Sequence, residues 1–584
     1  MKNLKTLLFL ILSAPVFAYQ GGTTRAHNHT STAGDGGLLS NLSVSGTFQA
    51  NVNNAANVMT YGAKGDGVTD DSTAFQAAVN ASSSVYIPCN TYMIGTGIVL
   101  NNRSQTAIFG AGPCSVLKQT ASNAMTMITI STGTDIWLKD FTIDGNYANE
   151  AGANTSGGVL VTKTSNRVTE QNLTLQNIDG PALQWNCTLV DPSVCHDNAM
   201  IANIIKNDNS IGGGMLAGNR QNEMRVIGNR VNSSGGTGEA ARMELQNSVV
   251  SGNVFVSTTS IAFTLNGGES TGEFGQNTIT GNYFLGHDIG LEVGNDNGMT
   301  EITGNHIEQE YCAGGCTALS FTGSGASVSS NTVISGNVII ATHTLVGFGS
   351  APLQTTWTGN LFRKTNPNDT SNWFNGTPSS STFISNIFDG ENMVSTYNIF
   401  SQQLSNVAMI GNVFNCGVGS NSNAIQVSGL SNNVGGTFLG NKFTNCTNTF
   451  LNGGFDYQIG DKVEAVATAT SFPATTVWGD LTSITLTPGT WAISGLETMT
   501  LNGATATEPV MGISTTSGNS ASGLVEGQNR ADYLPGTAAA DNSGSVPSWH
   551  QTYTANTTVY LKMLCNYSAG TPKVQGRLTA IKLQ

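Results

Sequence analysis

The sequence predicts an all-β protein whose main body is a parallel β-helix, a solenoid in which each turn of chain stacks on the turn before. A short pattern recurs through the middle of the chain: an apolar residue, a small residue, Gly-Asn, then alternating apolar residues. Successive copies lie 23 to 32 residues apart, which indicates a repeat architecture. The repeated segments alternate with period two, so they are strands and not helices. The Asn residues of the pattern are Asn229, Asn253, Asn282, Asn305, Asn337, Asn360, Asn386, Asn412 and Asn441.

The Gly-Asn pair gives this pattern a physical meaning. Leucine-rich repeats have a similar length, but their Leu-x-x-Leu-x-Leu framework is missing here. Gly and Asn accept left-handed backbone angles, which suits the corners of a solenoid. Equivalent Asn side chains then stack into an amide ladder along the axis. We therefore interpret these Asn residues as structural and do not count them as a site.

Length and charge limit the classes of partner. The chain has 584 residues, too many for one compact core, and a formal net charge of −13. An acidic surface argues against nucleic acid as a partner. It does not exclude an acidic sugar, because a local basic patch can lie on an acidic protein.

The chain begins with the features of an export signal. Lys2 and Lys5 precede an apolar run at 7–12, and Ala18 ends a stretch of small residues suited to cleavage. We expect residues 1–18 to be a signal peptide of a secreted protein. The run is too short to cross a bilayer, so no membrane contact is expected after cleavage.

The cysteines fit an exported protein, in which thiols can oxidise. Two pairs lie 25 and 30 residues apart, close to one turn of the solenoid, so each would stack: Cys89 with Cys114 and Cys416 with Cys446. The other residues are the neighbours Cys187 and Cys195, the neighbours Cys312 and Cys316, and Cys565, which is left over.

Both ends of the solenoid need cover. Residues 73–79 form an amphipathic helical pattern that Asp70 or Asp71 would cap. Toward the C-terminus, residues 481–494 alternate around a Pro-Gly turn and residues 557–564 form a further strand, which predicts an antiparallel β-sandwich over 459–584.

The residues just described resemble a known family. The stretch 61–79, beginning Tyr61-Gly-Ala-Lys-Gly-Asp-Gly, is similar to the opening motif of the pectate-lyase-like superfamily, and 85–92 and 108–112 continue it. That superfamily includes rhamnogalacturonase-like enzymes and phage tailspike depolymerases. The resemblance implies a right-handed β-helix over 57–455. It also implies that the opening acids, such as Asp66, are structural.

Two flanking segments resemble parts of phage tail fibres. Residues 19–56 are similar to a collar, in which His27 and His29 from three chains would supply six imidazoles to an iron-type ion. The alternative is a flexible polar leader. Residues 459–584 resemble trimerising or receptor-binding domains. A homotrimer on a virion tail is therefore expected, although the export signal keeps a secreted bacterial enzyme as an alternative.

Candidate site residues come from aligning one strand of each turn. We aligned 242–246 with 262–266, 290–294 and 318–322, with large apolar residues facing inward. The residues between them must then point outward. This predicts one exposed column, Glu244, Thr264, Glu292 and Ser320, with Arg242 beside Glu244 and with His287 and Asp288 entering the strand of Glu292.

Two chemistries fit this column. Glu244 and Glu292, two turns apart, would be about 10 Å apart, which suits an inverting glycoside hydrolase without a cofactor. Arg242 would anchor an acidic sugar, and Thr264 and His287 would contact the substrate. A lyase would instead hold calcium through Glu244, Glu292 and Asp288, with Arg242 or Lys206 nearby. A further cluster comprises His306, Glu308 and Glu310.

The function predicted from the sequence is a polysaccharide depolymerase, a hydrolase or lyase acting on an extracellular polysaccharide, either acidic or neutral. The alternative is a binder without catalysis, an adhesin or a phage tail receptor-binding protein. The acidic column favours the enzyme.

Overall fold

The computed structural model describes the chain from residue 55 onward, with gaps. The described ranges are 55–121, 125–149, 157–162, 164–186, 195–207, 214–233, 238–266, 274–294, 297–311, 316–322, 331–349, 354–376, 380–390, 393–394, 398–400, 407–416, 423–426, 437–445, 448–451, 462–471, 477–532, 542–568 and 570–583. The predicted signal peptide, most of the predicted collar and both of its histidines, His27 and His29, lie outside them. No helix in the described ranges is long and apolar enough to cross a membrane.

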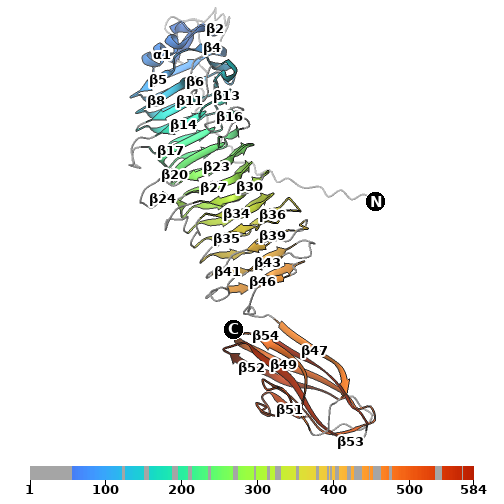
Figure 1. Cartoon of the computed structure of the whole chain (residues 1–584). Helices are drawn as coiled ribbons and strands as arrows, with labels where there is room; N and C mark the ends of the chain where they lie inside the picture. Colours follow the sequence, from blue (N-terminus) through green and yellow to red (C-terminus); the bar gives the residue numbers. More distant parts are fainter. Residues whose placement is uncertain are drawn as a thin grey trace, which may run out of the picture. The chain divides into compact units, whose positions relative to one another are not determined.

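The main body is a right-handed parallel β-helix with three sheets, which we call A, B and C (Figure 1). Each turn of chain passes from sheet A to sheet B to sheet C and then returns to sheet A one level further along, so every strand pairs in parallel with the equivalent strands of the adjacent turns. The fold class predicted from the repeat is confirmed.

Sheets A and B have fifteen strands each and sheet C has fourteen. The strands of sheet A are β1 (Ala56–Asn57), β3 (Ser84–Ile87), β6 (Ser104–Gly110), β9 (Thr134–Lys139), β12 (Asn166–Gln171), β15 (Ala199–Ile201), β18 (Arg225–Ile227), β21 (Val249–Ser251), β25 (Thr278–Thr280), β29 (Glu301–Thr303), β32 (Val333–Ser335), β35 (Thr356–Thr358), β38 (Thr382–Ile384), β41 (Ala408–Ile410) and β44 (Thr437–Leu439). Those of sheet B are β2 (Asp66–Asp70), β4 (Asn90–Ile94), β7 (Ser115–Gln119), β10 (Thr142–Asp144), β13 (Thr174–Gln176), β16 (Ile204–Asn207), β19 (Arg230–Ser233), β22 (Val254–Ser257), β26 (Tyr283–Gly286), β30 (His306–Gln309), β33 (Val338–Ala341), β36 (Leu361–Lys364), β39 (Ile387–Asp389), β42 (Val413–Asn415) and β45 (Lys442–Thr444). Those of sheet C are β5 (Ile98–Asn101), β8 (Thr126–Ser131), β11 (Gly157–Thr162), β14 (Leu183–Asn186), β17 (Met215–Asn222), β20 (Ala241–Gln246), β23 (Ile261–Asn266), β27 (Ile289–Val293), β31 (Thr317–Phe321), β34 (Thr344–Phe348), β37 (Phe374–Asn375), β40 (Asn398–Phe400), β43 (Asn423–Gln426) and β46 (Asn448–Leu451). A small two-stranded sheet joins β24 (Phe274–Gly275) to β28 (Asn297–Gly298).

The corner between sheets A and B explains the Gly-Asn repeat. Gly281 has a φ of +63°, a left-handed conformation that costs least for glycine. The Asn282 side chain that follows is buried and donates to the Asn305 side chain (2.9 Å) and to the Val250 carbonyl (2.8 Å). The same bonds recur from turn to turn, which confirms the predicted amide ladder; its members run from Asn203 to Asn441.

The interior of the helix is filled by inward-facing apolar side chains stacked in columns. Phe362, Phe388, Phe414 and Phe443 occupy one such column in sheet B, and successive ring centroids are 4.5 to 4.9 Å apart. This spacing equals the distance between adjacent strands, so each aromatic ring packs on the ring of the turn below.

The N-terminal end of the helix is covered by a short helix, as predicted. α1 spans Ser72–Ala81, after the 3-10 helix η1 (Val58–Tyr61); a second 3-10 helix, η2, spans Tyr147–Asn149. The Asp70 carboxylate accepts a bond from the backbone N–H of Ser72 at 3.0 Å, whereas that of Asp71 binds the N–H groups of Lys64 and Gly65. The helix residues that face the core are Phe75, Ala78 and Val79. The opening acids therefore have structural roles.

The disulfide expected between adjacent turns is present. Cys89 and Cys114 are bonded. Cys195, Cys316 and Cys416 are also in disulfides, and Cys565 is a buried free thiol, as its lack of a partner in the sequence pattern predicts.

The C-terminal part is an antiparallel β-sandwich of two four-stranded sheets, which confirms the predicted class. One sheet has the order β47 (Lys462–Ser471), β54 (Lys573–Lys582), β49 (Gly489–Thr500) and β52 (Asn542–Tyr553). The other has the order β48 (Gly479–Leu486), β53 (Thr557–Ser568), β50 (Thr505–Ser514) and β51 (Arg530–Asp532). Its core is formed by alternating residues of both sheets, including Trp491, Ile493, Leu561 and Leu578.

Candidate active site

The register of sheet C corrects the alignment on which the predicted column rests. Arg242 lies beside Thr264, Thr264 beside Glu292, and Glu292 beside Ser320. Glu244 instead lies beside Asn266, two residues further along the strands. The alignment was wrong by two residues between β20 and β23. Such a slip keeps the inward and outward faces intact, so the period-two pattern cannot detect it.

The corrected column is also less exposed than predicted. Thr264 has no exposed surface and Ser320 only 8%. Glu292 is half-buried, and its carboxylate accepts a hydrogen bond from the Thr322 hydroxyl at 2.8 Å. The column therefore presents Arg242 and Glu292 to solvent, with a buried threonine between them.

Glu239 completes this site, and the sequence alignment did not identify it. It lies in the turn from sheet B to sheet C, just before β20. The Arg242 guanidinium donates two bonds to its carboxylate, at 3.1 and 2.9 Å. Two parallel bonds of this kind give the strongest form of Arg–carboxylate pairing. Arg242 is therefore held by Glu239 and not by Glu244.

The surroundings of Glu239 change its affinity for a proton. Burial raises the pKa of Glu239, the nearby charge of Glu292 raises it further, and Arg242 opposes both effects. Only 16% of the Glu239 side chain is exposed. A carboxyl group that holds its proton more strongly than usual is suited to the role of a general acid.

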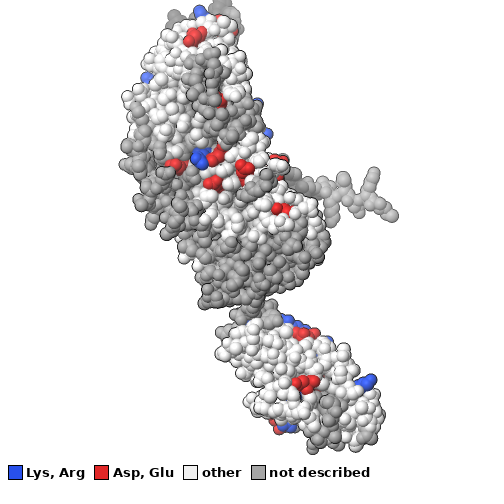
Figure 2. Space-filling model, viewed as in Figure 1, with Lys and Arg blue, Asp and Glu red and all other residues white. Residues whose placement is uncertain are grey.

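The register sets the spacing between Arg242 and Glu292. Arg242 and Glu292 are two strands apart in one column, about 10 Å at the backbone. Glu239 is joined to this column by its two hydrogen bonds from Arg242. Figure 2 shows one basic patch with several acidic patches around it on the middle of the β-helix, over the region labelled β20, β23 and β27 in Figure 1.

The predicted residues His287 and Asp288 lie at the same edge of sheet C. They occupy the turn between β26 and β27, where the His287 Nδ1 and an Asp288 carboxylate oxygen are 2.7 Å apart. The His287 ring also lies 5.6 Å from the Tyr311 ring. Both residues therefore lie at the corner between sheets B and C, as Glu239 does, but two turns of the β-helix further along the chain.

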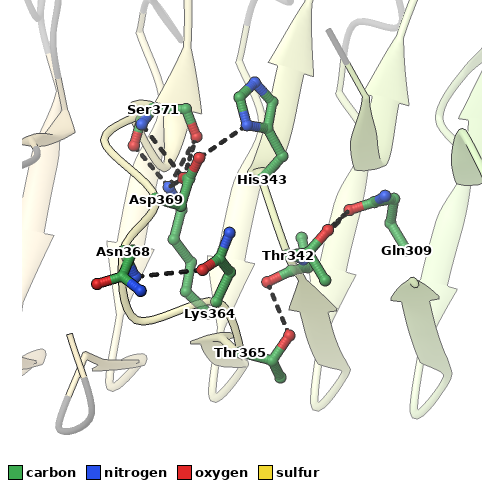
Figure 3. A network of polar contacts seen from close by, with 10 residues as sticks. Gln309, Thr342, His343, Lys364, Thr365, Asn368, Asp369 and Ser371 are labelled. Carbon is green, nitrogen blue, oxygen red and sulfur yellow. Dashed lines mark hydrogen bonds and ion pairs between the residues drawn. The ribbon is translucent and has the colours of Figure 1, made fainter. Parts of the chain in front are cut away.

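Three turns beyond Asp288, a buried lysine organises the same corner (Figure 3). The Lys364 side chain has no exposed surface, and its ammonium group contacts the Asp369 carboxylate and the Ser371 hydroxyl. The other Asp369 oxygen lies 2.8 Å from Nδ1 of His343. Burial lowers the pKa of Lys364 to about 8, although Asp369 opposes the shift. The network fixes the 365–373 loop and orients the His343 ring.

Sheet B carries a second group of titratable side chains on its outer face. The Tyr283 hydroxyl donates to the Glu308 carboxylate at 3.2 Å, and the His306 Nε2 lies 2.9 Å from the same oxygen. Burial and the charge of Glu308 raise the pKa of Tyr283. The sequence drew attention to His306 and Glu308, but Tyr283 joins them only through the register of β26 and β30.

The predicted calcium ligands Glu244, Glu292 and Asp288 are not a compact set of donor atoms. In the described part of the chain, three ligand atoms within 4.8 Å of one another are offered by His196, Asp197 and Glu223. The His196 Nδ1 is already 2.8 Å from the Asp197 carboxylate.

Part of the β-helix matches the model of a known protein family. Residues 55–338 match the family model described as rhamnogalacturonase A/epimerase, pectate lyase-like, which confirms the resemblance seen in the opening motif.

Two curated relatives and one solved structure are similar to parts of the chain. The pre-neck appendage protein of Bacillus phage phi29 is 44% identical over 96 residues, which are 15% of this chain and 11% of that protein. Alginate lyase 7 of Azotobacter vinelandii is 30% identical over 168 residues, 24% of this chain and 20% of that protein. The chain thus covers no more than a fifth of either relative. The structure of the pre-mature bacteriophage phi29 gene product 12 has a TM-score of 0.47 at 15% identity, covering 69% of this chain and 58% of that one.

Proposed function

Residues 55–338 belong to the rhamnogalacturonase A/epimerase, pectate-lyase-like family, and from this premise we propose that the protein cleaves an extracellular polysaccharide by hydrolysis at the outer face of sheet C. The observation that carries the proposal is the mostly buried Glu239 carboxyl group, paired with Arg242 in the column that also holds Glu292.

The proposed mechanism assigns one role to each acid. Glu239, whose pKa is raised, donates its proton to the glycosidic oxygen as the bond to the sugar breaks. Glu292 removes a proton from the water that attacks the sugar carbon from the opposite side. Arg242 releases part of its pairing with Glu239 to hold a sugar substituent.

The names of the relatives support the substrate class and the setting. Alginate lyase acts on a polysaccharide by its name, and the phage relative is a virion appendage. We therefore propose that the protein acts outside the cell, as a secreted or virion-associated enzyme. We expect the assembled protein to be a homotrimer, which analytical ultracentrifugation of the full chain tests.

The experiment is incubation with capsular polysaccharides, alginate and pectic polymers. New reducing ends without the ultraviolet absorbance of an unsaturated uronate indicate hydrolysis. Glu239→Gln and Glu292→Gln should each lower turnover by about 10²-fold or more. Glu244→Gln is the matched control, because it changes an acid in the strand that carries Arg242 but outside the corrected column. Activity lost in Glu244→Gln but kept in Glu239→Gln would reject the site.

A second candidate, elimination, is favoured by the Tyr283, His306 and Glu308 group on sheet B. A tyrosine hydroxyl and an imidazole that share one carboxylate can protonate the leaving oxygen and remove a sugar proton. The appearance of ultraviolet absorbance, and its loss in Tyr283→Phe, would favour this candidate. Binding without either product across the panel would leave the non-catalytic receptor-binding role.

A further inference from the structure

Sheet B carries a depression that lies on a different face from the acidic site. Strands β16 and β19 are adjacent there, with Ile204 beside Arg230 and Lys206 beside Asn232. These residues, with the buried Ile205 beneath them, line a hollow of about 430 Å³. A volume of this size suits a small organic ligand, because such sites typically measure about 300 to 1,000 Å³.

Two cations share this hollow. Lys206 and Arg230 are diagonal neighbours on adjacent strands, roughly 8 Å apart at the backbone from the strand spacing and rise. Both are exposed, and no ion pair joins either of them to an acid within the described ranges. Their positive charges therefore reinforce each other at one point of a chain whose net charge is −13.

Three other arginines of the β-helix are paired with acids. Arg167 pairs with Asp135, Arg242 with Glu239, and Arg363 with Asp389. The outward residues of the adjacent sheet B strands include no acid: Thr174 and Gln176 on β13, Val254 and Val256 on β22. The charge in the hollow is thus left available to a ligand.

We propose that Lys206 and Arg230 form a binding site for the carboxylate of an acidic sugar, separate from the cleavage site on sheet C. The Arg230 guanidinium matches a carboxylate through two parallel hydrogen bonds, and the Lys206 ammonium adds a second positive charge. Ile204, 38% exposed, offers an apolar contact to the C–H face of the sugar ring, and the Asn232 amide can bond a hydroxyl. The choice of a saccharide as ligand rests on the proposed function, whereas the anionic character rests on the site itself.

The test is isothermal titration of the full chain carrying Glu239→Gln, so that no substrate is cleaved. The probes are oligogalacturonate, oligomannuronate and methyl-esterified oligogalacturonate. We expect at least one acidic oligosaccharide to bind. Lys206→Gln combined with Arg230→Gln should weaken that binding at least tenfold or remove one binding event from the stoichiometry. The neutral ester should bind at least tenfold more weakly than its acid.

The matched control is Arg363→Gln, which removes a positive charge from the same face but from a residue paired with Asp389. It should leave affinity within twofold of the parent. Equal weakening by Arg363→Gln would show general charge attraction and overturn the site, as would binding of none of the acidic oligosaccharides. Displacement by equimolar inorganic sulfate would reject the sugar assignment. The cleavage assay is carried out separately on the unmodified protein. Absence of cleavage there would reject the proposed function but would not decide whether Lys206 and Arg230 bind an acidic sugar.

Discussion

Replacing Glu170 by Gln should stabilise the β-helix in a strictly pH-dependent way. Glu170 lies at the inward face of β12 with no exposed surface. One carboxylate oxygen accepts a bond from the Trp185 indole at 3.2 Å, and the other has no partner within the described ranges. Burial raises the pKa of Glu170 from 4.5 to about 8.

The sign and size of the effect follow from linkage. Below pH 4.5 the residue is protonated in both states and costs nothing. Between pH 4.5 and 8 the unfolded chain ionises and the folded chain does not, so stability falls as the pH rises. At about 1.4 kcal/mol per pH unit, the loss is about 3 kcal/mol at pH 7 and about 5 kcal/mol above pH 8. Glutamine has nearly the same shape as glutamic acid but does not ionise, so Glu170→Gln removes this pH-dependent loss.

Urea denaturation followed by tryptophan fluorescence at pH 5, 7 and 9 measures this difference. Glu170→Gln should exceed the wild type in unfolding free energy by an amount that grows across this series. Glu301→Gln, at an exposed position of sheet A, is the control and should show no such growth. A constant difference between Glu170→Gln and wild type would refute the argument, because it would mean that Glu170 has an ordinary pKa in the fold.

Three further outcomes are expected. Glu239→Gln should lower kcat by about 10²- to 10⁴-fold, the usual contribution of a general acid, and an unchanged kcat in the reducing-end assay would remove Glu239 from the mechanism. Asn282→Ala should cost about 3 kcal/mol in urea unfolding, because it leaves buried backbone and amide groups of adjacent turns without partners; a cost below about 1 kcal/mol would contradict the ladder's role. Lys364→Met should cost about 3 to 5 kcal/mol by leaving the Asp369 carboxylate uncompensated, and adding Asp369→Asn should recover part of this loss, whereas strictly additive effects would show that the pair does not interact.

The parts of the fold that local chemistry dictates could be predicted from the sequence. Gly281 and Asn282 need no knowledge of the rest of the chain, because the left-handed corner restricts which residues fit. The spacing of such corners then defines the turns. The capping helix was equally accessible, since its apolar face and its preceding acids are contiguous in the sequence.

The site was only partly predictable because it depends on register. The inward and outward faces were assigned correctly, but a two-residue shift leaves every face unchanged, and Glu244 therefore took the place that Arg242 occupies. Glu239 and Lys364 were missed for a different reason. Glu239 lies in a turn that has no periodicity. Lys364 occupies an inward position that periodicity assigns to an apolar side chain, and it is tolerated there only through Asp369 and Ser371.

The corner between sheets A and B also affects how such a molecule can change over generations. From β9 to β45 it always contains two residues, whereas the connection from sheet B to sheet C ranges from two residues between β26 and β27 to twelve between β10 and β11. Insertions are thus absorbed at the other two corners, while the corner between sheets A and B stays constant in length. Residues can therefore change at the corner between sheets B and C, where Glu239, Asp288 and His343 lie, without disturbing the asparagine ladder that aligns successive turns.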